Sequence, residues 1–373
     1  MKEILPIYIV CILLAFLSHR SSLYDYRLAR YKYKDRLFYA VIIVLTVIFA
    51  GMRTDYNDTA AYIRYYSAIE TSAGWLSEID WSVSEYPLFR VLNKVFKITG
   101  FSAQSFVLIY SAFSIGVFLW FIRKYTEDIT LSIFLFFTMG CYVFAMAAIK
   151  QCTATACCLL GIDRLLSTKH AKYIRFFLWV TVGMLFHPFS AMFYLCPFLT
   201  FSPWTLPSYL MIIVCAVGGY SLQTWLSSAL DLLSMVGIEY DETSALSESV
   251  NVLRVLVLWS PILLSFLSSK FWVRSKNKAD NLLLNLSTLC AEIMFIALFG
   301  NPLYFGRLAN YFLLFQTISL PFVLRFFEEN SKQVLKSIIF LGYSIFAVYR
   351  EALRGTTFDA RFSRITLWQY LGF

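Results

Sequence analysis

Five short polar clusters interrupt the apolar stretches of this chain, and their residues are of kinds that hold anions or move protons. Arginine and lysine bind anionic oxygens, while histidine and the carboxylates accept protons from hydroxyl groups. The clusters are Gly51 to Tyr56, Ser84 to Pro87, Lys150-Gln151, His187-Pro188 and Gly300 to Arg307, with Tyr311 just beyond the last. Ionisable groups near membrane depth are costly, so they tend to face a cavity or a partner and are functional candidates.

Each cluster also has an interpretation that involves no chemistry. Arg53 and Arg307 are placed to extend their side chains towards lipid headgroups, and Glu85 to be an ordinary loop charge. Lys150 lies in a polar turn that two apolar helices need anyway, and a lone histidine such as His187 is more often a hydrogen-bonded structural residue. Function is favoured because all five clusters fall on the same side of the predicted membrane topology.

The composition indicates that lipid is the solvent. The chain has 373 residues, 59% of them hydrophobic and 15% charged, with a mean hydropathy of +0.65. A soluble domain is near half apolar and about a quarter charged. The basic residues, which give a formal net charge of +9, fall in short clusters between apolar runs, so we attribute them to cytoplasmic loops and expect no nucleic-acid partner. The cysteines lie in or beside apolar runs, where we expect them to pack.

The apolar runs predict an all-α, polytopic integral membrane protein with a single membrane domain over residues 1–373. We interpret the first run as a membrane helix, because no small-residue cleavage pattern follows it. With one run crossing twice, there are about twelve transmembrane helices, each needing roughly 20 residues. The runs cover residues 4–18, 37–52, 102–122, 129–149, 152–166, 174–202, 207–227, 251–269, 281–299, 303–325 and 334–349.

The basic clusters orient these helices, because cytoplasmic loops carry an excess of lysine and arginine. Residues 53–101 then form one large external loop that contains an amphipathic, interfacial helix at 88–98, and the acidic residues 228–250 form a second external loop. The N-terminus is external. The cytoplasmic segments are residues 20–36, 123–124, 169–175 and 270–278.

The run 174–202 must fold as a hairpin for these loops to agree. Its break is His187-Pro188, since proline removes a helix hydrogen bond and disfavours helix at the preceding residue. The C-terminus is then external, although four arginines follow residue 349, which conflicts with the charge rule.

The sequence contains no credible metal site. Its three histidines, His19, His170 and His187, have no ligand spacing between them, and no nucleotide-binding glycine pattern is present.

The order and spacing of the five clusters resemble the EpsG family of Wzy-type polysaccharide polymerases. In that family we expect an arginine-containing Gly-x-x-x-Asp-Tyr element, a Glu-Pro-like element, an Arg-Gln pair, a Phe-His-x-Ser-Ala element and an arginine near a late helix. Lysine replaces the arginine of the pair, and Tyr86 and Phe189 are extra residues in two elements. The corresponding segments are Gly51-Met-Arg-Thr-Asp-Tyr56, Glu85-Tyr-Pro87, Ile149-Lys-Gln151, Phe186-His-Pro-Phe-Ser-Ala191 and Gly306-Arg307.

The resemblance implies a glycosyltransferase that polymerises an O-antigen, capsule or exopolysaccharide. It would move a growing glycan from polyprenyl diphosphate onto an incoming lipid-linked oligosaccharide repeat unit, at the outer, periplasmic face of the bacterial cytoplasmic (inner) membrane. A glycosyl diphosphate is already activated, so no cofactor is needed. We expect membrane lipid, a flippase and a chain-length regulator as further partners.

The same resemblance implies roles for the candidate residues. Diphosphate binding falls to Arg53, Arg307 and Lys150, although lysine lacks the bidentate fork of arginine. The base is His187, Asp55 or Glu85, and His187 ranks first because an unperturbed imidazole has a pKa of about 6.5. We expect the substrate to contact Tyr56, Gln151 and Tyr311.

Other functions share parts of this pattern. An O-antigen ligase or another lipid-linked-sugar glycosyltransferase uses the same leaving group, and a polysaccharide flippase or transporter also has many helices with intramembrane charge. Transporters usually show internal repeats, which are not obvious here. A structural membrane subunit would leave the polar clusters unexplained.

Overall fold

The computed structural model shows a mainly helical protein, which confirms the all-α fold class. It describes residues 4–20, 23–25, 30–32, 36–71, 79–168, 170–218, 221, 251–298, 302–353 and 361–362. The predicted second external loop, residues 228–250, lies outside this part of the chain. Strands within the described part form two short antiparallel pairs, β1 (Leu23–Asp25) with β2 (Arg30–Lys32), and β3 (Arg53–Asp55) with β4 (Arg361–Phe362).

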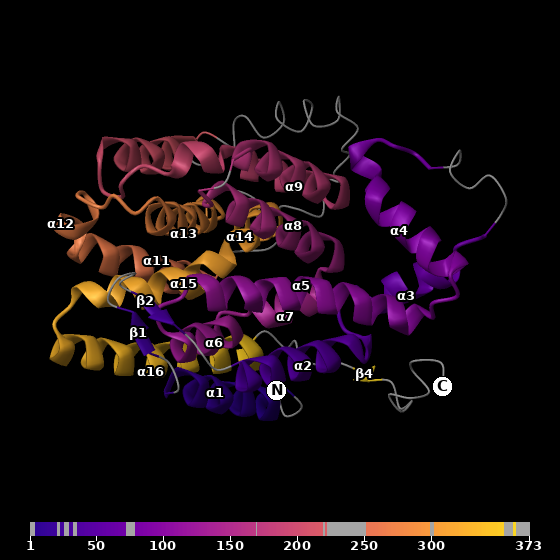
Figure 1. Ribbon diagram of the computed structural model, residues 1–373, viewed down its shortest axis with the longest axis horizontal. Coiled ribbons are helices and arrows are strands. Elements are labelled where there is room, and N and C mark those ends of the chain that lie inside the picture. Colours follow the sequence, from indigo (N-terminus) through magenta and orange to yellow (C-terminus); the bar gives the residue numbers. More distant parts are fainter. Residues whose placement is uncertain are drawn as a thin grey trace.

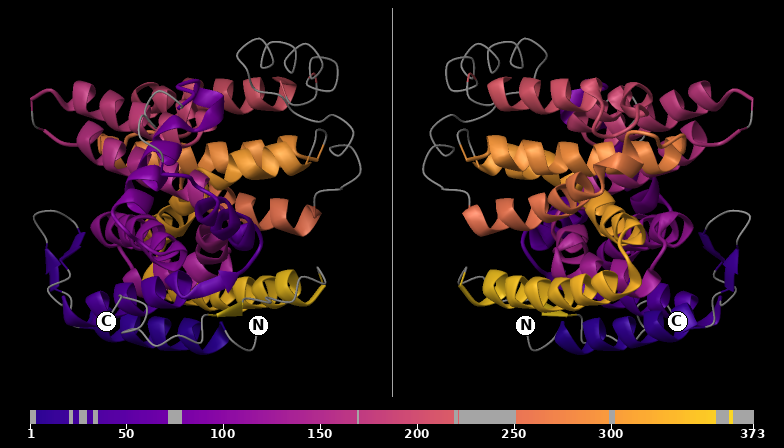
Figure 2. Two further views of the ribbon diagram at one scale, coloured as in Figure 1. Left: turned by 90° about the vertical axis from the view of Figure 1, so that its right-hand side faces the viewer. Right: turned by 90° about the vertical axis from the view of Figure 1, so that its left-hand side faces the viewer.

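Most helices lie side by side along the long axis of the molecule (Figure 1). In the two side views, α1, α2 and α16 form the layer at one edge, and α8 and α9 lie at the opposite edge (Figure 2). The first half of the bundle consists of α1 (Leu5–Arg20), α2 (Leu37–Gly51), α5 (Ala103–Tyr125), α6 (Ile129–Thr138), α7 (Cys141–Ala147), α8 (Ile149–Leu165), α9 (Lys172–Phe186) and the 3-10 helix η3 (Pro188–Leu199).

The second half begins with an apolar helix at Leu206–Gly218. It continues with α11 (Val252–Leu267), α12 (Ser269–Trp272), α13 (Lys278–Ile296), α14 (Pro302–Asn310), α15 (Leu313–Val323), η4 (Leu324–Phe326) and α16 (Glu329–Leu353). Between α2 and α5 the chain forms α3 (Thr59–Ser67), η2 (Val83–Glu85) and α4 (Pro87–Ile98), which extend beyond one end of the bundle (Figure 1). The predicted interfacial stretch at residues 88–98 is therefore helical.

Polar residues set where several helices begin. The side chains of Ser102, Asp128, Asn251 and Asn277 each accept hydrogen bonds from backbone N–H groups in the first turn that follows. Such caps satisfy donors that a helix leaves unpaired at its start.

The number of membrane crossings stays a prediction. Within the described residues, two helices are long and apolar enough to span a membrane alone, Ala103–Tyr125 and Lys278–Ile296. Two bent pairs would raise this to four: α6 with α7, bent by 50°, and α14 with α15, bent by 53°. Other apolar helices are shorter than the roughly 20 residues that a straight span needs. These helices support a multi-pass membrane protein.

The hairpin expected at His187 is present. Thr181 Oγ1 on α9 and Tyr194 Oη on η3 are 2.7 Å apart, and the rings of Phe177 and Tyr194 are 5.8 Å apart. A straight helix would separate Thr181 from Tyr194 by about 20 Å and Phe177 from Tyr194 by about 25 Å, at about 1.5 Å per residue. The chain therefore reverses at His187, and η3 packs back along α9.

Ion pairs gather at the end of the bundle opposite α3 and α4. Arg325 after α15 bonds Asp280 on α13 at 2.8 Å and also pairs with Glu127, which follows α5. Lys336 on α16 lies 2.6 Å from Asp128 at the start of α6. Elements distant in sequence thus end at one level, which is the end that the basic clusters predict to be cytoplasmic.

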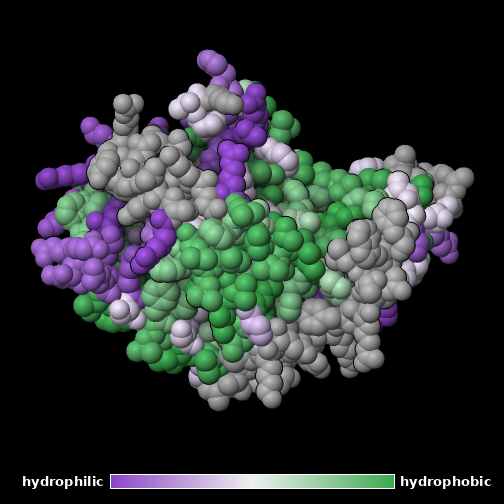
Figure 3. All heavy atoms as spheres, turned by 60° about the horizontal axis from the view of Figure 1, so that its bottom comes forward, coloured by the Kyte–Doolittle hydropathy of each residue, from purple (hydrophilic) through white to green (hydrophobic). Residues whose placement is uncertain are grey.

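Much of the lateral surface is apolar. Figure 3 shows a broad hydrophobic area across one face, with hydrophilic residues gathered at its side. Exposed large side chains lie on α1, α11 and α16, for instance Leu13, Leu263 and Leu341. All eight cysteines are free thiols, and all except Cys215 are buried, as expected for packing residues.

Candidate active site

His187 occupies the turn between α9 and η3, within a group of aromatic rings. Its Nδ1 is 2.6 Å from the hydroxyl of Tyr311, a buried residue between α14 and α15. The ring centroids of Tyr86, Phe189 and Tyr311 lie 5.6, 5.9 and 5.9 Å from that of the imidazole. One ring nitrogen is thus engaged by a phenol, which fixes the orientation of the imidazole and leaves Nε2 as the second proton-transfer atom.

Lys150, in the first turn of α8, belongs to the same group through its contact with Tyr86. Its Nζ lies 3.5 Å from the centre of the Tyr86 ring, and 5.9 and 5.8 Å from those of Tyr62 and Phe89. At these distances a cation–π interaction forms, and it stabilises an ammonium group that lies away from bulk water. Tyr86 therefore contacts the lysine ammonium and also lies beside the imidazole.

Tyr86 is held in an unusual backbone conformation. It has φ 55° and ψ 55°, the left-handed region that side chains other than glycine seldom occupy, immediately before Pro87 begins α4. Strain of this kind persists only where the surroundings hold the residue in place. The ammonium group of Lys150 over its ring and the imidazole of His187 beside it are such surroundings.

Arg307 is connected to this group in two ways. Its charge acts on His187, and its backbone carbonyl accepts a hydrogen bond from a residue of α8. The side chain of Gln151, next to Lys150, donates from Nε2 to the carbonyl of Arg307 at 2.7 Å, which joins α8 to α14. The Arg307 side chain is exposed. Gln151 thus acts as a brace for the segment that carries Arg307.

The electrostatics of the group favour a neutral imidazole and a bound anion. Burial lowers the pKa of His187 to about 4, with further lowering by the positive charges of Lys150 and Arg307. Burial raises the pKa of the Tyr86 phenol, and Arg307 opposes that rise. At neutral pH the imidazole is therefore uncharged and can accept a proton, next to two cations that can hold negative charge.

Arg53 lies apart from this group. Its side chain is fully buried, and it donates to Thr59 Oγ1 at 3.0 Å, to Ser111 Oγ at 2.9 Å and to the carbonyl of Ala50. These contacts tie the end of α2 to α3 and α5. The structure therefore gives Arg53 a bracing position, and its predicted diphosphate contact stays a prediction.

The other candidates are distributed around the same end of the bundle. Glu85 forms an ion pair with Arg90 on α4. Asp55 lies in β3, opposite Arg361 of β4, and Tyr56 packs against the hydrophobic core. Their catalytic or substrate-binding roles remain predictions, while His187, Lys150 and Arg307 are the candidates whose charges act on one another.

The sequence did not predict two sets of residues that the structure places at cationic sites. Tyr86 was visible only as an extra residue inside a motif, although it contacts both Lys150 and His187. Arg254 and Arg350 line a separate cavity. Arg254 could have been recognised as a charge inside an apolar run, the pattern that indicates function in membrane proteins. No group of metal-binding side chains occurs in the described part of the chain.

The comparison with protein families decides the general activity. The EpsG family matches residues 36–357, a range that includes all five polar clusters. The chain belongs to the EpsG family. This is a family of Wzy-like polysaccharide polymerases and glycosyltransferases, so the resemblance inferred from the clusters is confirmed, and the protein functions in polysaccharide biosynthesis. Comparisons with curated proteins and with solved structures give no significant match.

Proposed function

We propose that this EpsG-family protein is a polymerase that transfers a growing glycan from polyprenyl diphosphate onto an incoming lipid-linked repeat unit. The observation that carries the proposal is the position of the His187 imidazole, which is bonded to Tyr311 and close enough to Lys150 and Arg307 for both charges to act on it. Glycosyl transfer from a lipid diphosphate needs a proton acceptor beside a cationic site for the leaving group. These residues supply both at one end of the bundle, which the charge rule assigns to the outer face.

The bond changes can be assigned to particular atoms. The acceptor hydroxyl oxygen attacks the anomeric carbon of the donor sugar and gives its proton to His187 Nε2. In that tautomer Nδ1 carries hydrogen and donates to the Tyr311 hydroxyl. As the new carbon–oxygen bond forms, the bond from the anomeric carbon to the diphosphate oxygen breaks, and its electron pair leaves with the diphosphate. Lys150 and Arg307 stabilise that growing negative charge.

The substrate itself would adjust the base. In the free protein, Lys150 and Arg307 disfavour the imidazolium ion and keep the pKa of His187 low. A bound diphosphate brings negative charge, which compensates those cations and raises the pKa of the imidazole towards neutrality. A base works best when its pKa lies near the working pH, so the proton acceptor strengthens when the donor is in place.

The other side chains take positioning roles in this proposal. Gln151 holds α14 in place through the Arg307 carbonyl, and Arg53 holds the start of the long loop against α5. Tyr86 covers Lys150 and lies beside His187, where its ring can also stack on a sugar.

The direct test is His187→Gln, assayed with purified protein and lipid-linked repeat units. Glutamine retains hydrogen bonding but cannot act as the base, so the rate of polymerisation should fall by about 10²- to 10⁴-fold, with little change in substrate binding. His170→Gln is the matched control, because His170 is exposed in the turn before α9. A His187→Gln protein that polymerises at the rate of His170→Gln would exclude His187 as the base.

A further inference from the structure

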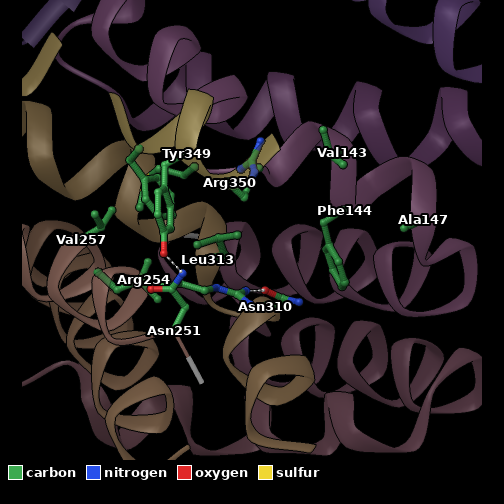
Figure 4. Close-up of a pocket in the computed structure, with 14 residues that line it drawn as sticks. Val143, Phe144, Ala147, Asn251, Arg254, Val257, Asn310, Leu313, Tyr349 and Arg350 are labelled. Carbon is green, nitrogen blue, oxygen red and sulfur yellow. Dashed lines mark hydrogen bonds between the residues drawn. The ribbon is translucent and has the colours of Figure 1, made fainter. Parts of the chain in front are cut away.

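A second cationic site lies on another side of α14. It is a cavity of about 180 Å³ between the bend that joins α6 to α7, the start of α11, the end of α14 and the end of α16. Figure 4 shows Arg254 and Arg350 reaching into it from α11 and α16. By comparison, a water molecule in the liquid occupies about 30 Å³, so the cavity has room for a small anionic group.

Both guanidinium groups are held by hydrogen bonds to neighbouring helices, one to a side chain and one to the backbone. Arg254 Nη2 donates to Asn310 Oδ1 at 2.8 Å, and Arg350 Nη1 donates to the carbonyl of Thr138 at 3.2 Å. Arg350 lies over Gly140, which has φ 89° and where a Cβ atom would collide with the guanidinium group. The break between α6 and α7 therefore makes space for an arginine head within the bundle.

Neutral polar groups complete one wall of the cavity. Asn251 Nδ2 donates to the Tyr349 hydroxyl at 3.0 Å, which joins α11 to α16 at the level of the two arginines (Figure 4). Two like charges on one small cavity repel each other, and an anion between them converts that repulsion into attraction. Guanidinium groups suit phosphate oxygens in particular, because they donate in a planar fork.

The remaining lining is apolar. Phe144, Val257, Leu258, Leu313 and Phe346 are among the residues that surround the two arginines. Beside the cavity, the outer faces of α11 and α16 expose large apolar side chains, among them Leu256, Ile345 and Val348. A ligand with a phosphate head and a hydrocarbon tail matches this division better than a free anion does.

We propose that the cavity marked by Arg254 and Arg350 binds the diphosphate of a second polyprenyl-linked substrate, the acceptor repeat unit. The inference rests on the proposed function, because a polymerase of this kind handles two lipid diphosphates at once. The structure offers two cationic sites around α14. Arg307 lies towards His187, whereas Gly306 and Asn310 face Arg254, and a helix with its side chains is roughly 10 Å wide.

The reaction geometry assigns one substrate to each site. The donor diphosphate is bonded to the anomeric carbon that is attacked, so it must lie beside the base, next to Lys150 and Arg307. The acceptor diphosphate is separated from the attacking hydroxyl by its own oligosaccharide. It therefore binds away from His187, in the cavity on the other side of α14.

The test counts bound ligands by native mass spectrometry, with geranylgeranyl diphosphate as the probe and no turnover. The wild-type protein should bind two equivalents. Arg254→Gln/Arg350→Gln should bind one, with affinity at the second site reduced about tenfold or more, whereas Arg274→Gln, an exposed arginine beyond α12, should still bind two. Val257→Trp fills the cavity without removing a charge and should also bind one, which separates loss of the site from misfolding.

Competition identifies the source of the phosphate. Neither phosphatidylglycerol nor inorganic diphosphate should displace the second equivalent at equal concentration. Displacement by phosphatidylglycerol would make the cavity a site for ordinary membrane lipid, and displacement by inorganic diphosphate would make it a free-anion site; either overturns the proposal. Two equivalents on both cavity variants would also overturn it. If the wild-type protein bound no probe at all, the proposed function itself would fail.

Discussion

At the scale of single residues, the pairing of His187 with Tyr311 and two neighbouring cations explains how an imidazole can serve as a base in an electropositive pocket. In the proposed reaction, the phenol fixes one ring nitrogen, and the cations keep the ring neutral until the diphosphate binds. In the proposed reaction Lys150 meets this need as a point charge, so a lysine where the sequence pattern led us to expect arginine is compatible with charge stabilisation, although it loses bidentate binding.

The pH dependence of the rate should differ between low and saturating substrate. The profile of kcat/KM reports the free protein, where the pKa of His187 is about 4, so this constant should stay level as pH falls from 7 and decline only as pH approaches 4. The profile of kcat reports the complex, where the diphosphate raises the pKa, so its acidic limb should lie at higher pH. Initial rates measured across pH at both substrate levels check this. Coincident acidic limbs would show that the substrate does not adjust the base.

The candidate residues were predictable to different degrees. Lys150, His187 and Arg307 carry charge or titrate at predicted helix ends, and the structure brings them together. Arg53 lies in an equally dense motif, yet its guanidinium group bonds Thr59 and Ser111. Whether an arginine faces a cavity or braces neighbouring helices depends on tertiary packing, which a linear pattern does not report.

At the scale of elements, breaks in helices position the polar groups. The break at His187 was predictable, because Pro188 follows it and the loop charges require a reversal. The bend after Thr138 was not, because the run 129–149 is apolar throughout and apolarity does not reveal that Gly140 takes a positive φ. The bend near Tyr311 was missed as well. These bends place Tyr311 beside His187 and open the space for Arg350.

The hairpin packs so closely against α8 that adding one methyl group at this contact should destabilise the protein. A Cβ atom at Gly183 would lie 2.9 Å from Cys158 Sγ and 3.0 Å from the Ala154 carbonyl, so Gly183→Ala must push α8 from α9. We expect a loss of about 1–3 kcal/mol in stability, seen as a lower thermal midpoint in detergent, and a displaced His187 with reduced activity.

Gly342→Ala provides the matched control for that substitution. Gly342 lies within α16, where a Cβ atom would meet nothing within 4 Å. Alanine in a helix interior stabilises by about 0.5–1 kcal/mol relative to glycine, so the thermal midpoint should stay or rise. Equal midpoints for the two variants would show that α8 and α9 are not packed as the structure has them.

At the scale of the whole molecule, the two ends of the bundle differ in kind. One end gathers ion pairs around Arg325 and Lys336, and the other gathers the candidate active site and the arginine cavity. The ion pairs lie next to the predicted cytoplasmic segments 123–124 and 270–278, and both of these segments fall at the first end. The alternation of loops was thus predictable from charge, although the number of crossings was not, because several helices are short or bent.

Thiol labelling can establish which end faces outwards. Single cysteines at Asp58, Arg274 and Ser331 occupy exposed positions, and Cys215→Ala gives a suitable background because the other native thiols are buried. An impermeant reagent should label position 58 on intact cells, and positions 274 and 331 only after permeabilisation. The reverse pattern would place the site on the cytoplasmic side.

Polymerisation itself can be measured most directly by supplying the purified protein, in detergent or in vesicles, with a lipid-linked repeat unit and no nucleotide. We predict a ladder of glycans that increase by whole repeat units, with one polyprenyl diphosphate released for every bond formed. Movement of unaltered lipid-linked units across the vesicle membrane, with no ladder and no released diphosphate, would contradict the proposed reaction and indicate a flippase.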